Sequence, residues 1–157
     1  RRLVGSEMCI RDSLCCVGGL ADSIGAADVT EVEWITTAAD KSEGFTLSVR
    51  VRYNEEVTVT GSPTIAVTNG NQGSGSGRGP HTLVYASGTG TNELVFSLAI
   101  AAANAATNAN DVLSIGAQNI AKPSGATIKD TADGTTNAAV AISADQGTAA
   151  GTLTVTA

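Results

Sequence analysis

Residues 45–68 place the strongest constraint on the fold, because apolar and polar side chains alternate through most of their length. Apolar residues occupy every second position over residues 45–53, with threonine, serine and arginine between them. A period of two is typical of a strand with one buried and one exposed face. The alternation resumes over residues 57–59 and again over residues 65–67, after polar interruptions. The pattern predicts one long strand, a kink and a second strand.

Shorter segments elsewhere in the chain have the same character. Residues 82–86 and 93–100 flank a glycine- and threonine-rich turn, which is the signature of a hairpin. The alanine-rich residues 99–109 contain asparagine and threonine, so they predict a loop or at most a short helix. The remaining predicted strands cover residues 29–35, 111–115, 119–121, 126–129, 138–142 and 151–156.

Composition places these strands in one all-β domain. The chain has 157 residues, which is enough for one domain with its own core. It contains 18 glycines and only 3% aromatic residues, and its polar residues are mostly Thr, Ser and Asn. Many short strands separated by turn residues favour a β-sandwich, with a closed barrel as the alternative. We expect residues 29–157 to form this domain.

Charge and hydropathy exclude several partners. The net charge of −6 argues against nucleic acid and anionic membranes, since phosphate binding needs clustered Lys and Arg. No apolar run approaches the eighteen or so residues of a membrane-spanning helix. The sequence therefore predicts neither a nucleic-acid partner nor membrane insertion.

The beginning of the chain differs from the rest. Residues 2–13 resemble the in-frame translation of a transposase sequencing adapter, and they include the only methionine, Met8. We therefore expect residues 1–13 to be non-native and residues 14–28 to be a flexible leader. The three cysteines, Cys9, Cys15 and Cys16, all lie in these segments, so the predicted domain does not depend on disulfides.

The glycine-rich residues 69–80 form the longest predicted loop. A phosphate-binding loop would lead into a helix and usually ends in Lys-Ser/Thr, whereas this one leads into a strand. The better interpretation is a hairpin tip that contacts a partner through Gly75, Gly77, Arg78 and His81. His81 is the only histidine and has no second His or Cys with which to hold a metal.

No catalytic constellation is visible in the sequence. A hydrolase is disfavoured because there is one histidine, no serine-centred elbow and no carboxylate pair whose placement can be argued. We expect neither enzymatic activity nor a cofactor. Trp34, the only tryptophan, is interpreted as a packing residue rather than as a ligand-stacking platform.

Three segments carry a resemblance to a known family. Residues 49–67 (VRVRYNEEVTVTGSPTIAV), 83–96 (LVYASGTGTNELVF) and 125–130 (GATIKD) resemble the immunoglobulin-like repeat of bacterial surface proteins and phage virion proteins. The resemblance spans about two thirds of the chain, and its motifs are structural turns that specify fold better than function. It implies an immunoglobulin-like antiparallel β-sandwich.

The resemblance also implies a function. It favours a non-enzymatic structural or decoration module of a marine bacteriophage virion, which packs against other virion proteins or against copies of itself. The alternative is an adhesin on a bacterial cell surface, or a carbohydrate-binding module that uses Trp34, Tyr53 or Tyr85 to bind a glycan.

Calcium is a further candidate ligand, because the family's repeats often end in an Asp-rich segment. Asp111, Asp130 and Asp133 are the weak candidates for such a site in this chain. Carboxylates are suitable calcium ligands, although the spacing matches no EF-hand. Capping of turns is the favoured role for these three residues.

Overall fold

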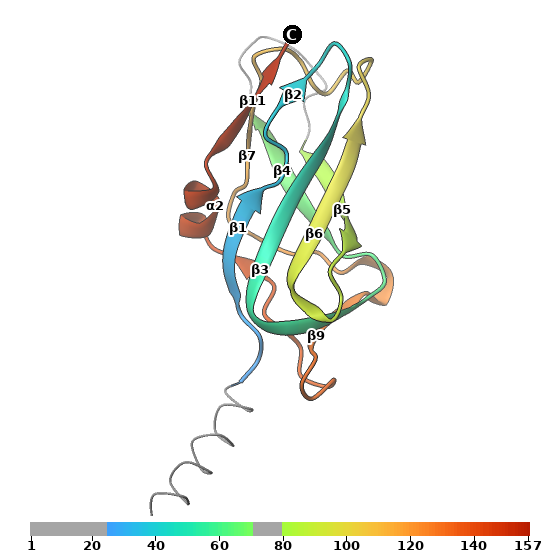
Figure 1. Cartoon of the computed structure of the whole chain (residues 1–157), viewed down its shortest axis with the longest axis vertical. Helices are drawn as coiled ribbons and strands as arrows, with labels where there is room; N and C mark the ends of the chain where they lie inside the picture. The colour runs from blue at the N-terminus through green and yellow to red at the C-terminus, as the bar shows by residue number, and fades with distance from the viewer. Residues whose placement is uncertain (1–24, 71–79) are drawn as a thin grey trace, which may run out of the picture.

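The computed structural model describes residues 25–70 and 80–157, which form a mostly β structure with one α-helix (Figure 1). The all-β prediction is confirmed. The strands are β1 (Val29–Trp34), β2 (Ala39–Asp40), β3 (Phe45–Thr60), β4 (Thr64–Gly70), β5 (His81–Ser87), β6 (Thr91–Ile100), β7 (Val112–Ser114), β8 (Gln118–Asn119), β9 (Thr127–Asp130), β10 (Ala141–Ile142) and β11 (Thr152–Thr156). The helices are a 3₁₀ turn, η1 (Pro123–Gly125), and α2 (Ala144–Ala150).

Strand β3 is the centre of the fold, as its alternation predicts. It is 16 residues long and pairs with β1, β6 and β9. Its register with β6 shifts between Arg52 and Val57, and beyond this point the strand pairs with β9. The predicted kink is therefore a register shift within one continuous strand.

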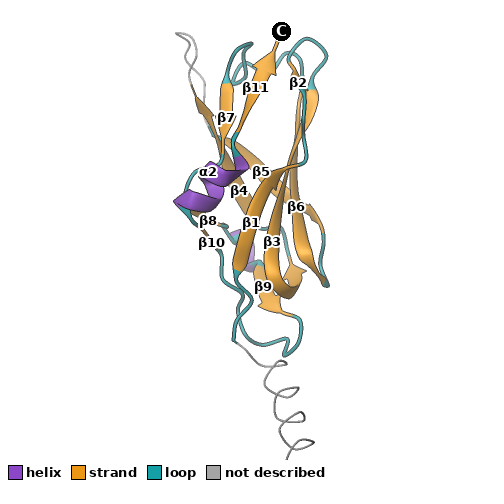
Figure 2. Cartoon of the chain, turned by 60° about the vertical axis from the view of Figure 1, so that its left-hand side comes forward, coloured by secondary structure: helices purple, strands orange, loops and turns teal. Residues whose placement is uncertain are grey.

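Nine strands form one curled sheet in the order β1-β3-β6-β5-β4-β7-β11-β2, with β9 beside β3. Figure 2 shows β1, β3 and β6 in one layer and β4, β7 and β11 in the other. Strand β5 joins the layers because it pairs with both β6 and β4. Apolar side chains from both layers meet between them, and those buried to 2% exposure or less include Leu47, Val49, Tyr53, Leu83, Phe96, Leu113 and Val155.

The chain crosses from one layer to the other between β1 and β2. The Thr36 hydroxyl donates to the Thr46 carbonyl and accepts from the Ser48 amide, both at 2.7 Å, where the β1–β3 pairing ends. Strand β2 then pairs in parallel with β11. Alternation in the sequence cannot indicate β2, because a two-residue strand is too short to show a period.

The second layer is interrupted in its middle. Strands β7 and β8 lie on either side of residues 115–117, and β10 and β11 lie on either side of α2. The side-chain oxygen of Gln118 accepts from the Ala66 amide at 2.7 Å, and the side-chain nitrogen donates to the Ala66 carbonyl at 2.7 Å. The side chain thus makes the hydrogen bonds that a residue of a neighbouring strand would make. Helix α2 begins with a capping box between Ser143 and Gln146.

Helix α2 packs through Gly147 against residues 115–116, which follow β7. A Cβ built at Gly147 would lie 2.2 Å from the Ile115 carbonyl oxygen, which is closer than any real contact. Gly to Ala inside a helix normally stabilises by about 1 kcal/mol, because glycine loses more backbone entropy on folding. At this position the contact with the Ile115 backbone should make the substitution destabilising instead.

We predict that Gly147→Ala lowers the free energy of unfolding by about 2 kcal/mol, in the range for overpacking a tight site. Urea denaturation measures the change. Gly116→Ala is the matched control, since a Cβ there meets nothing within 4 Å. Equal stability of the two variants would show that α2 does not pack on Ile115 through this glycine.

Candidate functional site

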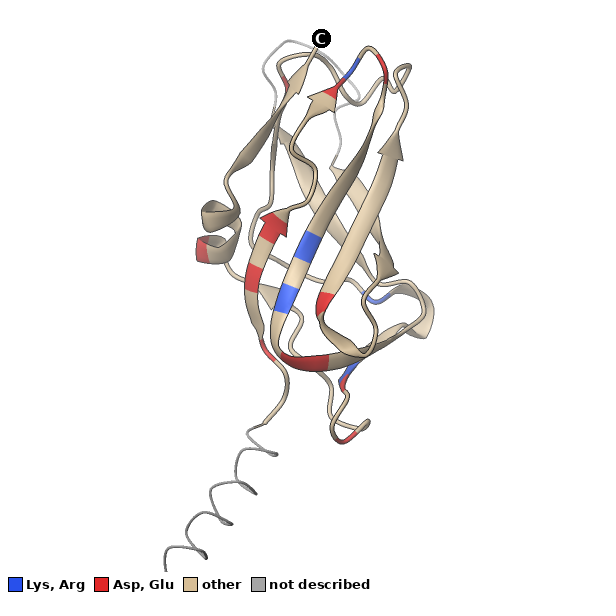
Figure 3. Ribbon diagram, in the orientation of Figure 1, with Lys and Arg blue, Asp and Glu red and all other residues tan. Residues whose placement is uncertain are grey.

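The outward face of β1, β3 and β6 carries a cluster of charged side chains (Figure 3). Glu31 and Glu33 extend from β1, Arg50 and Arg52 from β3, and Glu93 from β6. The strand register places Glu31 opposite Arg52, Glu33 opposite Arg50, and Arg52 opposite Glu93. We call these five residues the Arg–Glu network.

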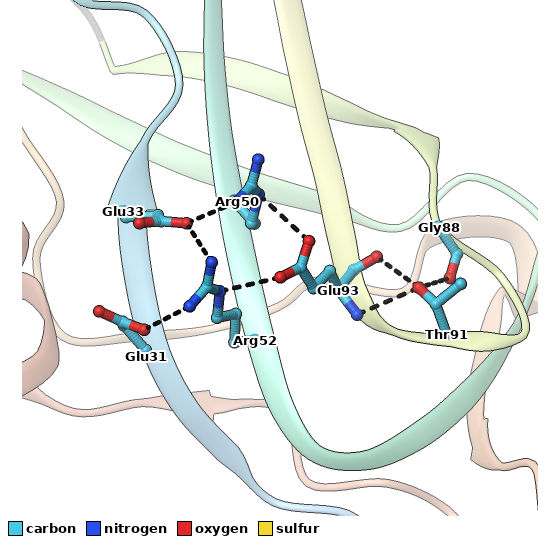
Figure 4. Close-up of polar contacts among 7 residues, drawn as sticks. All are labelled: Glu31, Glu33, Arg50, Arg52, Gly88, Thr91 and Glu93. Carbon is cyan, nitrogen blue, oxygen red and sulfur yellow. Dashed lines mark hydrogen bonds and ion pairs between the residues drawn. The ribbon is translucent and has the colours of Figure 1, made fainter.

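Each arginine contacts carboxylates on both neighbouring strands (Figure 4). Arg50 lies 2.9 Å from Glu33 and 3.5 Å from Glu93. Arg52 lies 3.3 Å from Glu31, 3.2 Å from Glu33 and 3.1 Å from Glu93. The two Nε atoms face Glu93 without making a well-aligned hydrogen bond, so these contacts are chiefly electrostatic. Together the contacts fix a row of negative, positive and negative charge across three strands.

The network lies at the surface, where ion pairs add little stability. Its side chains are between 31% and 53% exposed. Exposed pairs typically contribute about 0–1 kcal/mol each, because water and salt screen them. The network therefore contributes little to the stability of the fold.

The β5–β6 hairpin positions Glu93 within this network. The Thr91 hydroxyl lies 2.7 Å from the Gly88 carbonyl, 3.0 Å from the Glu93 carbonyl and 3.1 Å from the Glu93 amide (Figure 4). This hydroxyl ties the turn to the first residues of β6. The geometry of the hairpin consequently sets where the Glu93 carboxylate meets the two arginines.

A second group of polar residues is buried where β4, β5 and the loop before β7 meet. It consists of Asn69, His81, Thr107 and Asp111, each at most 9% exposed, and we call it the buried polar cluster. His81 Nε2 lies 3.1 Å from Thr107 Oγ1. Burial lowers the pKa of His81, while the Asp111 carboxylate opposes this shift. His81 is therefore predominantly neutral at pH 7.

The predicted partner-contact residues fall into two groups. Gly75, Gly77 and Arg78 lie outside the described residues. His81 is described, and its side chain is 4% exposed and packed against Thr107. Its side chain therefore lies in the interior rather than at a contact surface, since β5 begins there with its first residue turned inward.

The three aspartates considered for calcium do not converge. Asp111 lies immediately before β7, whereas Asp130 is the last residue of β9 and Asp133 follows it; β9 lies at the lower end of the molecule, away from β7 (Figure 1). Asp130 accepts from the Ala132 amide at 2.7 Å. Asp133 accepts from the Thr135 and Thr136 amides at 2.8 Å and from the Thr136 hydroxyl, which lowers its pKa to about 2. Both residues cap the turn after β9.

No protein-family model, curated protein or solved structure matches the chain. Within residues 25–70 and 80–157, no three His, Cys, Asp or Glu side chains form a group that could hold a metal ion. In the same residues no helix is long and apolar enough to cross a membrane.

The aromatic residues considered for glycan binding make internal contacts. Trp34 donates its indole N–H to the Gly151 carbonyl at 3.2 Å, and the Tyr53 hydroxyl donates to the Ala139 carbonyl at 3.1 Å. Tyr85 packs edge-on against Phe96, with ring centroids 6.1 Å apart. Its hydroxyl also accepts from the Thr89 amide at 2.8 Å. Packing roles therefore account for all three residues.

The carboxyl group of Glu55 on β3 interacts with the carboxylates of Asp130 and Asp28. The pKa of Glu55 is raised by its own burial, then by a hydrogen bond to Asp130 and by the charges of Asp130 and Asp28. A carboxyl group with a raised folded-state pKa stabilises the fold below its unfolded pKa, and this contribution is lost as the pH rises through the folded value. Glu55 therefore favours the folded state less at neutral pH than in acid.

We predict that Glu55→Gln gives a small increase in Tm at pH 7 and that the increase disappears below about pH 4, where Glu55 is protonated in both states. Thermal melts followed by circular dichroism over this pH range measure the effect. Glu56→Gln, on the exposed neighbouring residue, is the control for the change in net charge. An increase in Tm that persists unchanged in acid would contradict the raised pKa of Glu55.

Proposed function

We propose that this chain is a structural or decoration module of a bacteriophage virion, and that it acts by packing against other proteins through the Arg–Glu network. The observation that carries the proposal is the network itself, in which three strands hold five charged side chains in one arrangement at the surface. Because these side chains already restrain one another, a partner has little side-chain entropy to remove on binding. The alternating charge row provides specificity for a partner with the complementary pattern.

The arrangement of strands supports an immunoglobulin-like sandwich. In constant-type immunoglobulin domains the strand order is A-B-E-D in one sheet and C-F-G in the other. The order β1-β3-β6-β5 corresponds to the first, and β4-β7-β11 to the second. Residues 115–150 are then an insertion between the last two strands of the second sheet, and β9 within this insertion pairs with β3 of the first. This correspondence agrees with the family resemblance of the sequence.

The position of the network also suits packing on a particle. The described chain begins at the lower end of the molecule, and the C-terminus lies at the upper end (Figure 1). The network lies on the broad face between these ends (Figure 3). A neighbour can therefore approach this face without meeting either end of the described chain.

The experiment compares binding of charge-reversed variants to purified phage particles by co-sedimentation. Arg50→Glu combined with Arg52→Glu inverts the centre of the network. Lys122→Glu combined with Lys129→Glu makes the same change in net charge near β9, away from the network. We expect the first variant to lose at least about tenfold in affinity, as is typical when buried interface charges are reversed, and the control to bind like the wild type.

Circular dichroism establishes that both variants fold. Equal binding of the network variant and the control would show that the network is not part of the interface. A wild-type protein that does not associate with particles at all would contradict the structural role.

A further inference from the structure

The buried polar cluster surrounds one peptide bond, between Ala106 and Thr107. Thr107 Oγ1, the hydroxyl on the C-terminal side of this bond, lies 3.1 Å from His81 Nε2. The Ala106 carbonyl oxygen, on the other side of the bond, accepts from Asn69 Nδ2 at 2.6 Å. A nucleophile, a base and a donor to the carbonyl oxygen therefore meet at a single amide.

Two hydrogen-bond acceptors fix the orientation of the Asn69 side-chain amide. Its Nδ2 atom donates both to the Ala106 carbonyl and to Asp111 Oδ2, the latter at 3.0 Å. A rotated amide would place an oxygen against two acceptors, so only the observed orientation is favourable. Asp111 also accepts from the Asn108 amide at 2.8 Å, which holds the chain just beyond Thr107. Asp111 is thus a positioning residue for the donor.

The cluster is costly for stability alone. Asn69 Oδ1 is buried and has no hydrogen-bond partner, and leaving a buried polar atom unsatisfied destabilises a fold. Two of the hydrogen bonds that the cluster does make are directed at Ala106 and Thr107. Unsatisfied buried groups in folded proteins call for an explanation, and a chemical role is one of them.

We propose that the chain cleaves itself between Ala106 and Thr107. His81 Nε2 accepts the proton of the Thr107 hydroxyl, and Oγ1 attacks the Ala106 carbonyl carbon while Asn69 Nδ2 stabilises the developing oxyanion. The C–N bond breaks as His81 returns the proton to the Thr107 nitrogen, which leaves an ester between Ala106 and Oγ1. Water then hydrolyses the ester to an Ala106 carboxylate and a free Thr107 hydroxyl and amine.

The surroundings are compatible with each step. Neutral His81 is the form that accepts a proton, so acid should suppress the reaction. Ala105 is exposed and Ala106 half-buried, so water can approach the ester from the loop surface. Sheet pairing of β4 with β7, β3 with β9, and β2 with β11 would hold the two products together after cleavage. The cut would then be visible only after denaturation.

Denaturing mass spectrometry of the purified full chain, stored at pH 7.5, tests this proposal independently of any virion role. We expect two fragments that end at Ala106 and begin at Thr107, with a summed mass one water above that of the intact chain. Neutral hydroxylamine should accelerate the cut by capturing the ester as an Ala106 hydroxamate. Cleavage at Asn69–Gly70, the other bond that hydroxylamine attacks, gives different masses and is scored separately.

Substitutions test the roles of Thr107 and His81 in the cleavage. Thr107→Val should abolish the cut while nearly preserving shape, and Thr107→Ser should retain it. His81→Gln should slow it at least about 100-fold and remove its loss in acid, since general bases contribute about 10²–10⁴. Thr68→Val is the control on an exposed threonine of β4. An intact wild-type mass after storage with hydroxylamine, or equal cleavage of Thr107→Val, would overturn the proposal.

Discussion

Gly88→Ala should lower the free energy of unfolding by about 3 kcal/mol or more, the range reserved for severe backbone or packing conflicts. A Cβ at Gly88 would lie 1.9 Å from the Glu93 carbonyl oxygen, and the residue has a φ of +114°. Both the contact and the backbone conformation oppose a side chain, and neither partner can move without opening the β5–β6 hairpin. Urea denaturation measures the loss.

Gly90→Ala separates the two causes. Gly90 belongs to the same hairpin and also has a positive φ, +77°, but a Cβ there meets nothing within 4 Å. It should cost only about 1–2 kcal/mol, the penalty of the left-handed conformation alone. If both variants lost the same amount, the close approach of Gly88 to Glu93 would not be a feature of the protein in solution.

Asn69→Asp is expected to be the most damaging isosteric change. It replaces an N–H donor, 2.6 Å from the Ala106 carbonyl and 3.0 Å from Asp111, with a charged oxygen. Two hydrogen bonds are lost, and two carboxylates face each other in a buried site. We expect a loss of about 3–5 kcal/mol at pH 7, similar to that from leaving a buried charge without its partner.

Asn104→Asp makes the same chemical change in the neighbouring loop and should be nearly neutral. The Asn104 side chain already acts as an acceptor, through Oδ1 to the Ala106 amide at 2.8 Å, and a carboxylate retains this role. Chemical denaturation of both variants at pH 7 provides the comparison. A tolerated Asn69→Asp would mean that the Asn69 side chain does not donate to Ala106 and Asp111 in solution.

The sequence predicts the long strands because their period is visible over many residues. Strand β3 and the β5–β6 hairpin follow directly from alternation and turn chemistry. Strand β2 could not be found this way, because two residues carry no period and its parallel partner β11 lies at the other end of the chain. Helix α2 is short, but the Ser143-x-x-Gln146 capping signature was present in the sequence and could have indicated its start.

The candidate sites were harder to foresee. The Glu-x-Glu of β1 and the Arg-x-Arg of β3 are visible as paired charges, but only strand register brings them together. The same limit applies to the buried polar cluster, whose members come from three separate segments. The sequence predicts His81 to be a partner-contact residue at the end of the glycine-rich loop, whereas its place in the alternation of β5 turns it inward.

Quantitative mass spectrometry of purified phage particles tests the proposed function most directly. The structural role predicts abundant peptides from residues 29–157 at a copy number comparable with that of the capsid protein. Particles that lack these peptides, together with a gene located beside bacterial secretion genes, would contradict a virion role and favour the adhesin.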